Sequence, residues 1–508
     1  MGGGTDGIKT LVALADIQKV ANDPDLCDTV DFSRIDGHTR PIQPVRVPVS
    51  KTIPGALADS YGVPEVTFHR RIVFMVTITV TLLVAAALWR LRSGVIHLEL
   101  FLIWIAPLLG LRAFGWVLSC LDKPHTVTKA QQDHLDSLWV TVSIPCFNED
   151  TGILDRVLWS LANQTRPPNR IDLVDDGSTK VDYEVLKRYW TSQPSPFTYF
   201  TWTWKENEGK RRAHCKTFAK DPRADFFITC DSDTTPALTA VDEIIKPFAD
   251  PDVQSVAGVE LGFNANLNFL TVIQNALQQI AQVVVAAAWS VSGDMFTNRG
   301  PFAAYRAPMI REILPLYYGE KFYGHRVVLG DDSLLALAGS MRGRSVQQLS
   351  AFGLTMWPEN LSHHLRQRVR WARGRTIRNF WRLKYYRINS YIYLFTIANI
   401  YAFIVGFAAI FRIILTAPNA VGIIGRMVIA IIALGWLSQF RCLAIRRTDE
   451  TIVDRTLLIA IRPIASLWAS IVLTRIVRFI GTVTCLRQGW TTRQHGAEIV
   501  LKVEGRTK

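Results

Sequence analysis

The sequence has few of the features that mark secreted, zinc-binding or nucleic-acid-binding proteins. Its seven cysteines are scattered, odd in number and without a C-x-x-C pair, so neither a disulfide framework nor a zinc site is predicted. No signal peptide is visible, because the first apolar run begins only near Ile72. No recognisable nucleic-acid-binding motif accompanies the net charge of +14, and we expect no nucleic-acid partner.

Charged residues are also scarce. They make up 20% of the chain against 49% for hydrophobic residues, which is a high hydrophobic share for a soluble enzyme. Many of the basic residues stand beside apolar segments, as at Arg70, Arg71 and Arg455. That placement favours contact with phospholipid headgroups. The composition therefore predicts a protein that is partly embedded in a lipid bilayer.

Several apolar runs are long enough to cross a bilayer as helices. Ile72 to Trp89 and Val95 to Cys120 are predicted to form a hairpin with cytosolic flanks, and Tyr391 to Leu415 and Val421 to Phe440 a second hairpin. The last run, Leu457 to Leu486, is a poor single span. A broken or re-entrant helix is expected there, because lone arginines facing lipid are costly and the run contains Arg462, Pro463, Arg475 and Arg478.

Between the two hairpins, short β-branched runs alternate with helical stretches. Strands are expected within Leu138–Pro145, Arg170–Ser178 and Ala224–Asp233, with a helix over Ile153–Leu161 after the first. Each apolar strand ends in polar residues. This pattern predicts an open, largely parallel α/β sheet, whose ligands bind at the carboxyl ends of its strands.

Four short polar motifs occur in a fixed order within this block. They are VDDGS at Val174–Ser178, DSD at Asp231–Asp233, GDD at Gly330–Asp332 and QRVRW at Gln367–Trp371. Asp and Gly are common in solvated turns, which is the alternative interpretation of each acidic motif alone. A D-x-D at a strand end, however, supplies the hard carboxylate oxygens that Mg²⁺ or Mn²⁺ prefers when it bridges a diphosphate.

The order of these motifs resembles that of the membrane-embedded family-2 glycosyltransferases that polymerise sugars from nucleotide donors, most closely the hyaluronan synthases. The chain also resembles chitin, chitin-oligosaccharide and cellulose synthases, and the resemblance covers roughly Phe74 to Gln494. It implies an α/β, GT-A-like glycosyltransferase domain inserted between N- and C-terminal transmembrane helices. It also implies a multi-pass plasma-membrane protein whose catalytic domain is cytosolic.

The organisation expected from the runs and the resemblance has six parts. They are a mobile N-terminal extension (1–69), a transmembrane hairpin (70–121), a cytosolic GT-A domain (135–371), an interfacial amphipathic helix (372–390), a transmembrane or re-entrant channel region (391–488), and a gating loop with a cytosolic tail (489–508).

The acidic motifs supply the expected donor site and base. Asp233 is the expected primary metal ligand with Asp231 beside it, and the resemblance also places Asp231 near the donor sugar or ribose. By the same resemblance Asp176 hydrogen-bonds the uracil, and Lys210 of the G-K-R segment lies near the nucleotide. Inverting transfer needs one carboxylate that takes a proton from the acceptor hydroxyl, and Asp332 is the expected base. Asp331 is then a helix N-cap or an orienting residue.

The basic motifs complete the expected site. Gln367, Arg370 and Trp371 share one helical face, so Arg370 could neutralise the departing diphosphate while Trp371 walls the acceptor sugar. An amphipathic helix with arginines reaching toward the membrane surface is the alternative. Trp490 to Arg493 resembles the W-x-T-R loop that closes over the nucleotide in the synthases, so Trp490 and Arg493 are expected donor contacts.

We therefore expect a membrane-integrated inverting transferase that polymerises UDP-sugars, with Mg²⁺ or Mn²⁺, and passes the polysaccharide across the bilayer. The growing polysaccharide is its acceptor. A chitin-, chitin-oligosaccharide- or cellulose-like synthase, a non-processive transferase acting on a lipid carrier, and a non-catalytic membrane transporter or sensor stay open as alternatives. The sequence determines neither the sugar, the linkage and the chain length nor the oligomeric state.

Overall fold

The structure is a computed structural model of the 508-residue chain, and it describes residues 64–66, 106–192, 198–416, 418–439, 441–442, 445–447 and 451–488. Nearly all of the predicted N-terminal extension, the first predicted span and the expected donor contacts Trp490 and Arg493 lie outside the described residues.

The centre of the protein is an eight-stranded mixed sheet with the strand order β4-β3-β2-β5-β8-β7-β11-β6. Strands β4, β3, β2 and β5 are parallel, β8 is antiparallel to both of its neighbours, and β11 pairs in parallel with β7. The three strands predicted from the sequence are β2, β3 and β5, so that prediction is confirmed. The strands are β2 (Val140–Cys146), β3 (Arg170–Asp175), β4 (Tyr199–Trp204), β5 (Phe226–Cys230), β6 (Thr235–Pro236), β7 (Val253–Gly262), β8 (Phe302–Arg306) and β11 (Arg344–Thr355).

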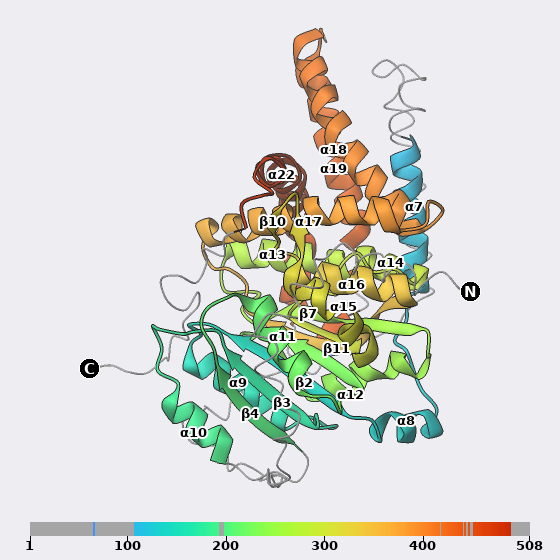
Figure 1. Ribbon diagram of the computed structural model, residues 1–508. Helices are drawn as coiled ribbons and strands as arrows, with labels where there is room; N and C mark the ends of the chain where they lie inside the picture. Colours follow the sequence, from blue (N-terminus) through green and yellow to red (C-terminus); the bar gives the residue numbers. More distant parts are fainter. Residues whose placement is uncertain are drawn as a thin grey trace.

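Helices pack on both faces of this sheet (Figure 1). The predicted helix after β2 is α9 (Thr151–Ala162), which begins where the Asp150 carboxylate accepts hydrogen bonds from the amides of Gly152 and Ile153. It shares a buried apolar cluster with α12 (Ala240–Ile245). A second cluster joins α11 (Lys210–Lys220), α15 (Ala307–Gly319) and α16 (Asp331–Arg342). Further helices of this part are α8 (Lys129–Asp136) and α10 (Glu184–Ser192).

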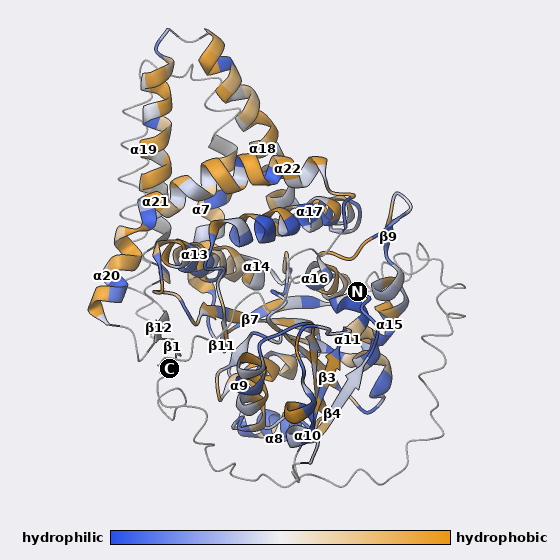
Figure 2. Ribbon diagram, turned by 90° about the vertical axis from the view of Figure 1, so that its left-hand side faces the viewer, coloured by the Kyte–Doolittle hydropathy of each residue, from blue (hydrophilic) through white to orange (hydrophobic). Residues whose placement is uncertain are grey.

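Three of the described helical segments are long and apolar enough to cross a membrane: Phe269–Ser292, Tyr391–Thr416 and Arg462–Val483. The second is α18, which with α19 (Ala420–Gln439) forms the predicted second hairpin, and Figure 2 shows both helices as mainly hydrophobic. The first, which joins α13 (Phe269–Ile280), a π-helical turn η4 (Ala281–Ala286) and α14 (Ala287–Ser292), was not predicted as a span. Part of the first predicted hairpin is present as α7 (Ala106–Leu121).

The last apolar run is broken, as predicted. It contains α20 (Ile452–Ala460), α21 (Arg462–Leu467), the π-helical η6 (Trp468–Val477) and α22 (Arg478–Val483), with the break at Ile461. The part beyond the break is nevertheless long enough to span by itself. The guanidinium groups of its arginines donate hydrogen bonds to main-chain carbonyls of neighbouring helices, so they have polar partners inside the protein. The bonds run from Arg462 to Gly435 at 3.2 Å, from Arg475 to Ala402 at 3.0 Å and from Arg478 to Asn399 at 3.0 Å.

One long helix, α17 (Leu361–Tyr385), runs between the sheet and the apolar helices (Figure 1). It contains the whole QRVRW motif, so the predicted boundary between residues 371 and 372 falls inside a continuous helix. Its backbone approaches α22 very closely: a Cβ on Gly481 would lie 2.4 Å from the Cβ of Ala372. The polar motif and the apolar region are therefore joined by direct helix packing.

Elsewhere, β1 (Pro64–Val66), within the segment predicted as an extension, pairs antiparallel with β12 (Ile445–Arg447).

Candidate active site

The sequence motifs converge on one cavity of about 640 Å³ at the carboxyl ends of β3 and β5, between the sheet and α17. All the predicted site residues that the structure describes line it. They are Asp176, Lys210, Asp231, Asp233, Asp332, Gln367, Arg370 and Trp371. Residues up to about 200 positions apart in the sequence thus share one chamber, which the sequence alone did not establish.

Asp176, the expected uracil contact, lies at the end of β3 and is buried. Its carboxylate accepts hydrogen bonds from the amides of Glu208 at 3.1 Å and Gly209 at 2.8 Å, and it forms an ion pair with Lys205. Burial raises the pKa of this carboxyl, although Lys205 and the two amides oppose the shift. Asp176 therefore fixes the start of α11, one residue before Lys210.

Lys210 joins two of the acidic motifs. Its ammonium lies 2.5 Å from Oδ1 of Asp231 and 3.8 Å from Oδ2 of Asp331. Burial raises the pKa of Asp231 even though the lysine opposes the shift. For Asp331, burial acts in the same direction, but the positive groups around it, with Lys210 the largest contributor among them, together outweigh burial and hold the pKa of that carboxyl below its usual range. Lys210 is therefore a fixed cation between the DSD and GDD motifs.

Asp231 and Asp233 supply the ligand types that a divalent cation requires. Both line the cavity just beyond the end of β5. No group of three or more His, Cys, Asp or Glu side chains that could hold a metal occurs among the described residues. Mg²⁺ commonly binds one or two protein carboxylates and takes its other ligands from phosphates and water. Two hard carboxylates thus fit a cation whose coordination a substrate diphosphate would complete.

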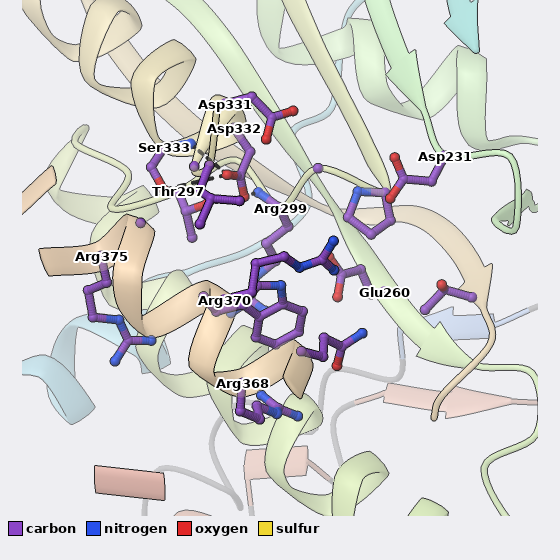
Figure 3. A pocket seen from close by; sticks show the side chains of 18 of the residues that line it. Asp231, Glu260, Thr297, Arg299, Asp331, Asp332, Ser333, Arg368, Arg370 and Arg375 are labelled. Carbon is purple, nitrogen blue, oxygen red and sulfur yellow. Dashed lines mark hydrogen bonds between the residues drawn. The ribbon is translucent and has the colours of Figure 1, made fainter. Parts of the chain in front are cut away.

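The GDD motif begins α16 and points its second aspartate at the cavity. Oδ2 of Asp332 accepts a hydrogen bond from the Thr297 hydroxyl at 2.6 Å, and Oδ1 accepts one from the Ser333 amide at 2.8 Å (Figure 3). Asp331 also lines the cavity, but it faces Lys210. The two neighbouring carboxylates therefore have different surroundings, and Asp332 has no ion pair of 4 Å or less among the described residues.

The QRVRW motif forms the wall opposite the carboxylates. Gln367, Arg370 and Trp371 come from adjacent turns of α17 and all line the cavity, as their spacing predicted. Trp371 is 38% exposed, and the guanidinium of Arg368 lies 4.5 Å from the centre of its ring. An aromatic face beside polar groups is the kind of surface on which a sugar ring can pack through its C–H groups.

Three further cavity residues were not identified from the sequence. Glu260 on β7 and Arg299 in the loop before β8 lie together near the centre of the cavity, and Thr297 holds Asp332 (Figure 3). Burial raises the pKa of Glu260 to about 7, against the opposing charge of Arg299. None of these residues belongs to a short motif, and β7 is a long buried strand whose sequence resembles core. Only the three-dimensional arrangement identifies them.

The cavity does not end at the sheet domain. Its lining continues onto the apolar helices with Phe395 and Asn399 of α18, Leu473 of η6 and Arg478 of α22. A single continuous chamber therefore connects the carboxylates with segments that are long and apolar enough to span a membrane.

Comparison with known proteins agrees with this geometry. Residues 141–314 match the glycosyl transferase family 2 model. The chain is 31% identical over 273 residues to a hyaluronan synthase of Streptococcus pyogenes, covering 53% of this chain and 65% of the relative. It is 32% identical over 239 residues to an N-acetylglucosaminyltransferase of Rhizobium meliloti, covering 46% of this chain and 55% of the relative.

Among solved structures, a mannosyltransferase of Pyrobaculum calidifontis in complex with GDP-Man and Mn²⁺ matches with a TM-score of 0.46 at 18% identity, covering 72% of this chain and 98% of that one. The chain spans just under two thirds of the length of the hyaluronan synthases that it matches. The family match extends from β2 into α15 and includes the VDDGS and DSD motifs. Residues 141–314 thus match the family-2 glycosyl transferases, and the chain is similar to hyaluronan synthases.

Proposed function

We propose that this protein is a membrane-integrated inverting glycosyltransferase that polymerises sugars from UDP-sugar donors and passes the product across the bilayer. The continuous cavity carries the proposal. It contains the acidic and basic motifs at one end and side chains of the apolar helices at the other. A transferase whose acceptor stays in the cytosol has no need of a reaction chamber that opens between such helices.

The proposed chemistry is the transfer of a glycosyl unit from UDP to an acceptor hydroxyl with inversion. Asp332 takes the hydroxyl proton as the oxygen attacks the anomeric carbon from the face opposite the leaving UDP. Thr297 and the Ser333 amide orient the carboxylate, since they hold one oxygen each. Asp331 is the poorer candidate for the base, because its carboxylate faces Lys210 and the surrounding positive groups hold its pKa below the usual range.

The other motif residues bind and orient. Arg370 meets the negative charge that develops on the departing diphosphate, and Trp371 supports the ring of the acceptor sugar. Asp233 and Asp231 would hold Mg²⁺ or Mn²⁺, which when bound neutralises diphosphate charge. The mannosyltransferase complex with Mn²⁺ accords with such an ion without identifying it. Trp490 and Arg493 are proposed to close over the nucleotide.

The proposed location is the plasma membrane, as a multi-pass protein with its glycosyltransferase domain in the cytosol. The three candidate spans and the similarity to hyaluronan synthases support it. The positive side chains of α17, which lie along the boundary between the sheet domain and the apolar helices, also suit a cytosolic membrane surface.

A product assay tests the proposal. Membranes containing the protein are given radiolabelled UDP-GlcNAc, UDP-GlcA and UDP-Glc singly and in pairs, with Mg²⁺ or Mn²⁺, and the product is sized by gel filtration and digested with specific glycosidases. Long polysaccharide that lies inside sealed, inverted vesicles is the expected result. A short lipid-linked product would be consistent with a glycosyltransferase activity but would refute polymerisation. Binding of a UDP-sugar without turnover of any donor would indicate a transporter or a sensor.

A further inference from the structure

A buried glutamate at the end of α15 links the elements that carry the motifs. Glu320 lies between Arg211 of α11 and Arg378 of α17, and all three side chains are at most 4% exposed. Its Oε2 lies 2.8 Å from NH1 of Arg211, and Arg378 donates two hydrogen bonds of 2.8 Å and 3.0 Å to the same carboxylate. One carboxylate therefore joins three helices that are far apart in the sequence.

Both arginines extend to the main chain that leads into the GDD motif. NH2 of Arg211 donates to the carbonyl of Leu329 at 3.1 Å, and NH2 of Arg378 donates to the carbonyl of Gly330 at 3.3 Å. Glu320 also contributes through its own backbone, since its carbonyl accepts a hydrogen bond from the Val327 amide at 2.8 Å. That bond closes the short hairpin of β9 (Lys321–Phe322) and β10 (His325–Arg326), from which the GDD loop emerges.

The same loop is held from its other sides. Gly330 has φ 72°, a conformation that favours glycine, and its backbone meets Gly374 of α17 so closely that a Cβ on Gly374 would lie 3.3 Å from the Gly330 nitrogen. The side-chain carbonyl of Gln488 accepts hydrogen bonds from the amides of Val328 and Leu329 at 3.0 Å and 3.3 Å. The position of this loop is thus over-determined just before Asp332.

We propose that Glu320 is a positioning residue for the transfer reaction: through Arg211 and Arg378 it sets the carboxylate of Asp332 relative to Lys210 and Trp371. Arg211 is the next residue after Lys210, and Arg378 follows Trp371 by two turns of α17. Each arginine therefore connects Glu320 with one wall of the cavity. Glu320 itself does not line the cavity. This inference rests on the proposed function, because it takes Asp332 as the base.

The chemistry of the cluster supports a role in geometry. Burial alone would raise the pKa of Glu320, but the charges of Arg378 and Arg211 outweigh it and hold the pKa below its usual range, so the carboxylate stays ionised. Buried ion clusters often add little stability compared with well-packed apolar side chains. Their directional bonds, however, permit few alternative arrangements, and bidentate arginine pairs are the most restrictive.

The experiment compares Glu320→Gln with the wild type. Glutamine keeps the size of the side chain but removes the charge and one acceptor. We expect kcat to fall by about ten-fold or more. The KM for the UDP-sugar and the affinity for UDP should stay within about two-fold, since no donor contact is changed. Asp172→Asn is the matched control: Asp172 is a buried carboxylate of β3 that lies 3.8 Å from Arg170 and outside the cavity, and its loss should lower thermal stability without changing kcat.

A double-mutant cycle separates positioning from general damage. If Glu320 acts through Asp332, Glu320→Gln should have no further effect on the residual rate of an Asp332→Asn protein. Wild-type kcat in Glu320→Gln, or a full additive loss in the double mutant, would overturn the inference. Retained turnover in Asp332→Asn alone would instead contradict the proposed base.

A second variant covers the case in which Glu320→Gln does not fold. Arg378→Lys keeps the positive charge beside Glu320 but cannot make the bidentate pair and the bond to Gly330 together. We expect a folded protein, monodisperse in detergent, with lowered kcat and unchanged UDP affinity. A folded Arg378→Lys protein with wild-type kcat would overturn the inference.

Discussion

Replacing Asp332 by asparagine removes a proton acceptor and almost nothing else. Oδ2 of Asp332 accepts a hydrogen bond from the Thr297 hydroxyl at 2.6 Å, and Oδ1 accepts from the amide and the hydroxyl of Ser333 at 2.8 Å and 3.5 Å. Asparagine can keep its oxygen on the amide and turn its NH₂ group toward Thr297, whose hydroxyl oxygen can accept that bond. The shape and the hydrogen bonds of the site are then preserved, and no ion pair within the described part of the chain is lost.

The expected loss follows from the role of a general base. Such groups contribute about 10² to 10⁴ in rate, which corresponds to about 3 to 5 kcal/mol of transition-state stabilisation. We therefore expect the kcat of Asp332→Asn to fall by at least about 100-fold. The affinity for UDP should stay within about two-fold, because the change alters no group assigned to the nucleotide. Radiolabelled turnover and isothermal calorimetry with UDP, both on purified protein in detergent or nanodiscs, provide the two measurements.

Neighbouring variants make the result specific. Asp331→Asn removes the more distant of the two carboxylates beside Lys210 and should weaken donor binding more than it slows the chemical step. Thr297→Val leaves the base in place but frees one oxygen, so a smaller loss of kcat is expected. Turnover by Asp332→Asn within ten-fold of the wild type, in a protein that still binds UDP, would refute the assignment of Asp332 as the base.

Three further predictions concern other parts of the cavity. Gly374→Ala should displace the Gly330 loop and so lower kcat on the order of ten-fold, measured by steady-state kinetics. Gly425→Ala is the control and should leave kcat unchanged, because a Cβ at Gly425 meets nothing within 4 Å. Chelation should abolish turnover and Mn²⁺ or Mg²⁺ should restore it, with Asp233→Asn needing more metal in the titration. Glu260→Gln should become more stable than the wild type as the pH rises from 5 to 8, measured as Tm by intrinsic fluorescence.

The sign of the Glu260 effect follows from its raised pKa. The pKa of the buried carboxyl is about 7, against an ordinary value of 4.5 in the unfolded chain, so the stability present below pH 4.5 is lost as the pH rises through 7. The full effect is about 3 kcal/mol. Glutamine does not titrate and escapes this loss. A wild-type protein that instead gains stability over the variant as the pH rises would mean that Glu260 is ionised and stabilised by Arg299 in the folded state.

The sequence predicted the structure best where a short residue pattern fits only one kind of secondary structure. Strands β2, β3 and β5 are short β-branched runs ended by polar residues, and their carboxyl ends meet where the motifs were expected. The candidate span Phe269–Ser292 was not identified from the sequence because it is only moderately apolar and interrupted by glutamines, several of which are buried against protein. Periodicity cannot distinguish such a helix from an ordinary core helix.

Contacts between distant parts of the chain could not be predicted from the sequence. Glu320 and Glu260 carry no motif, and nothing local separates them from surface glutamates. Their roles depend on guanidinium groups from distant parts of the chain: Arg211 is 109 positions from Glu320, and Arg368 of α17 acts on Glu260 through its charge. The predicted start of the interfacial helix at residue 372 was wrong, because the aromatic and basic stretch after Trp371 continues the same helix that carries the motif.

The close packing of Gly481 on Ala372 has a consequence for the surroundings of the protein. α22 belongs to a segment long enough to span a bilayer, and it touches α17 at the residue next to Trp371. In the proposed membrane location, a tilt of α22 that matches the thickness of the surrounding lipid would therefore be transmitted through Ala372 to the cavity wall that contains Trp371. We therefore expect the rate of the proposed transfer reaction to depend on the acyl-chain length of the lipids in which the protein is reconstituted.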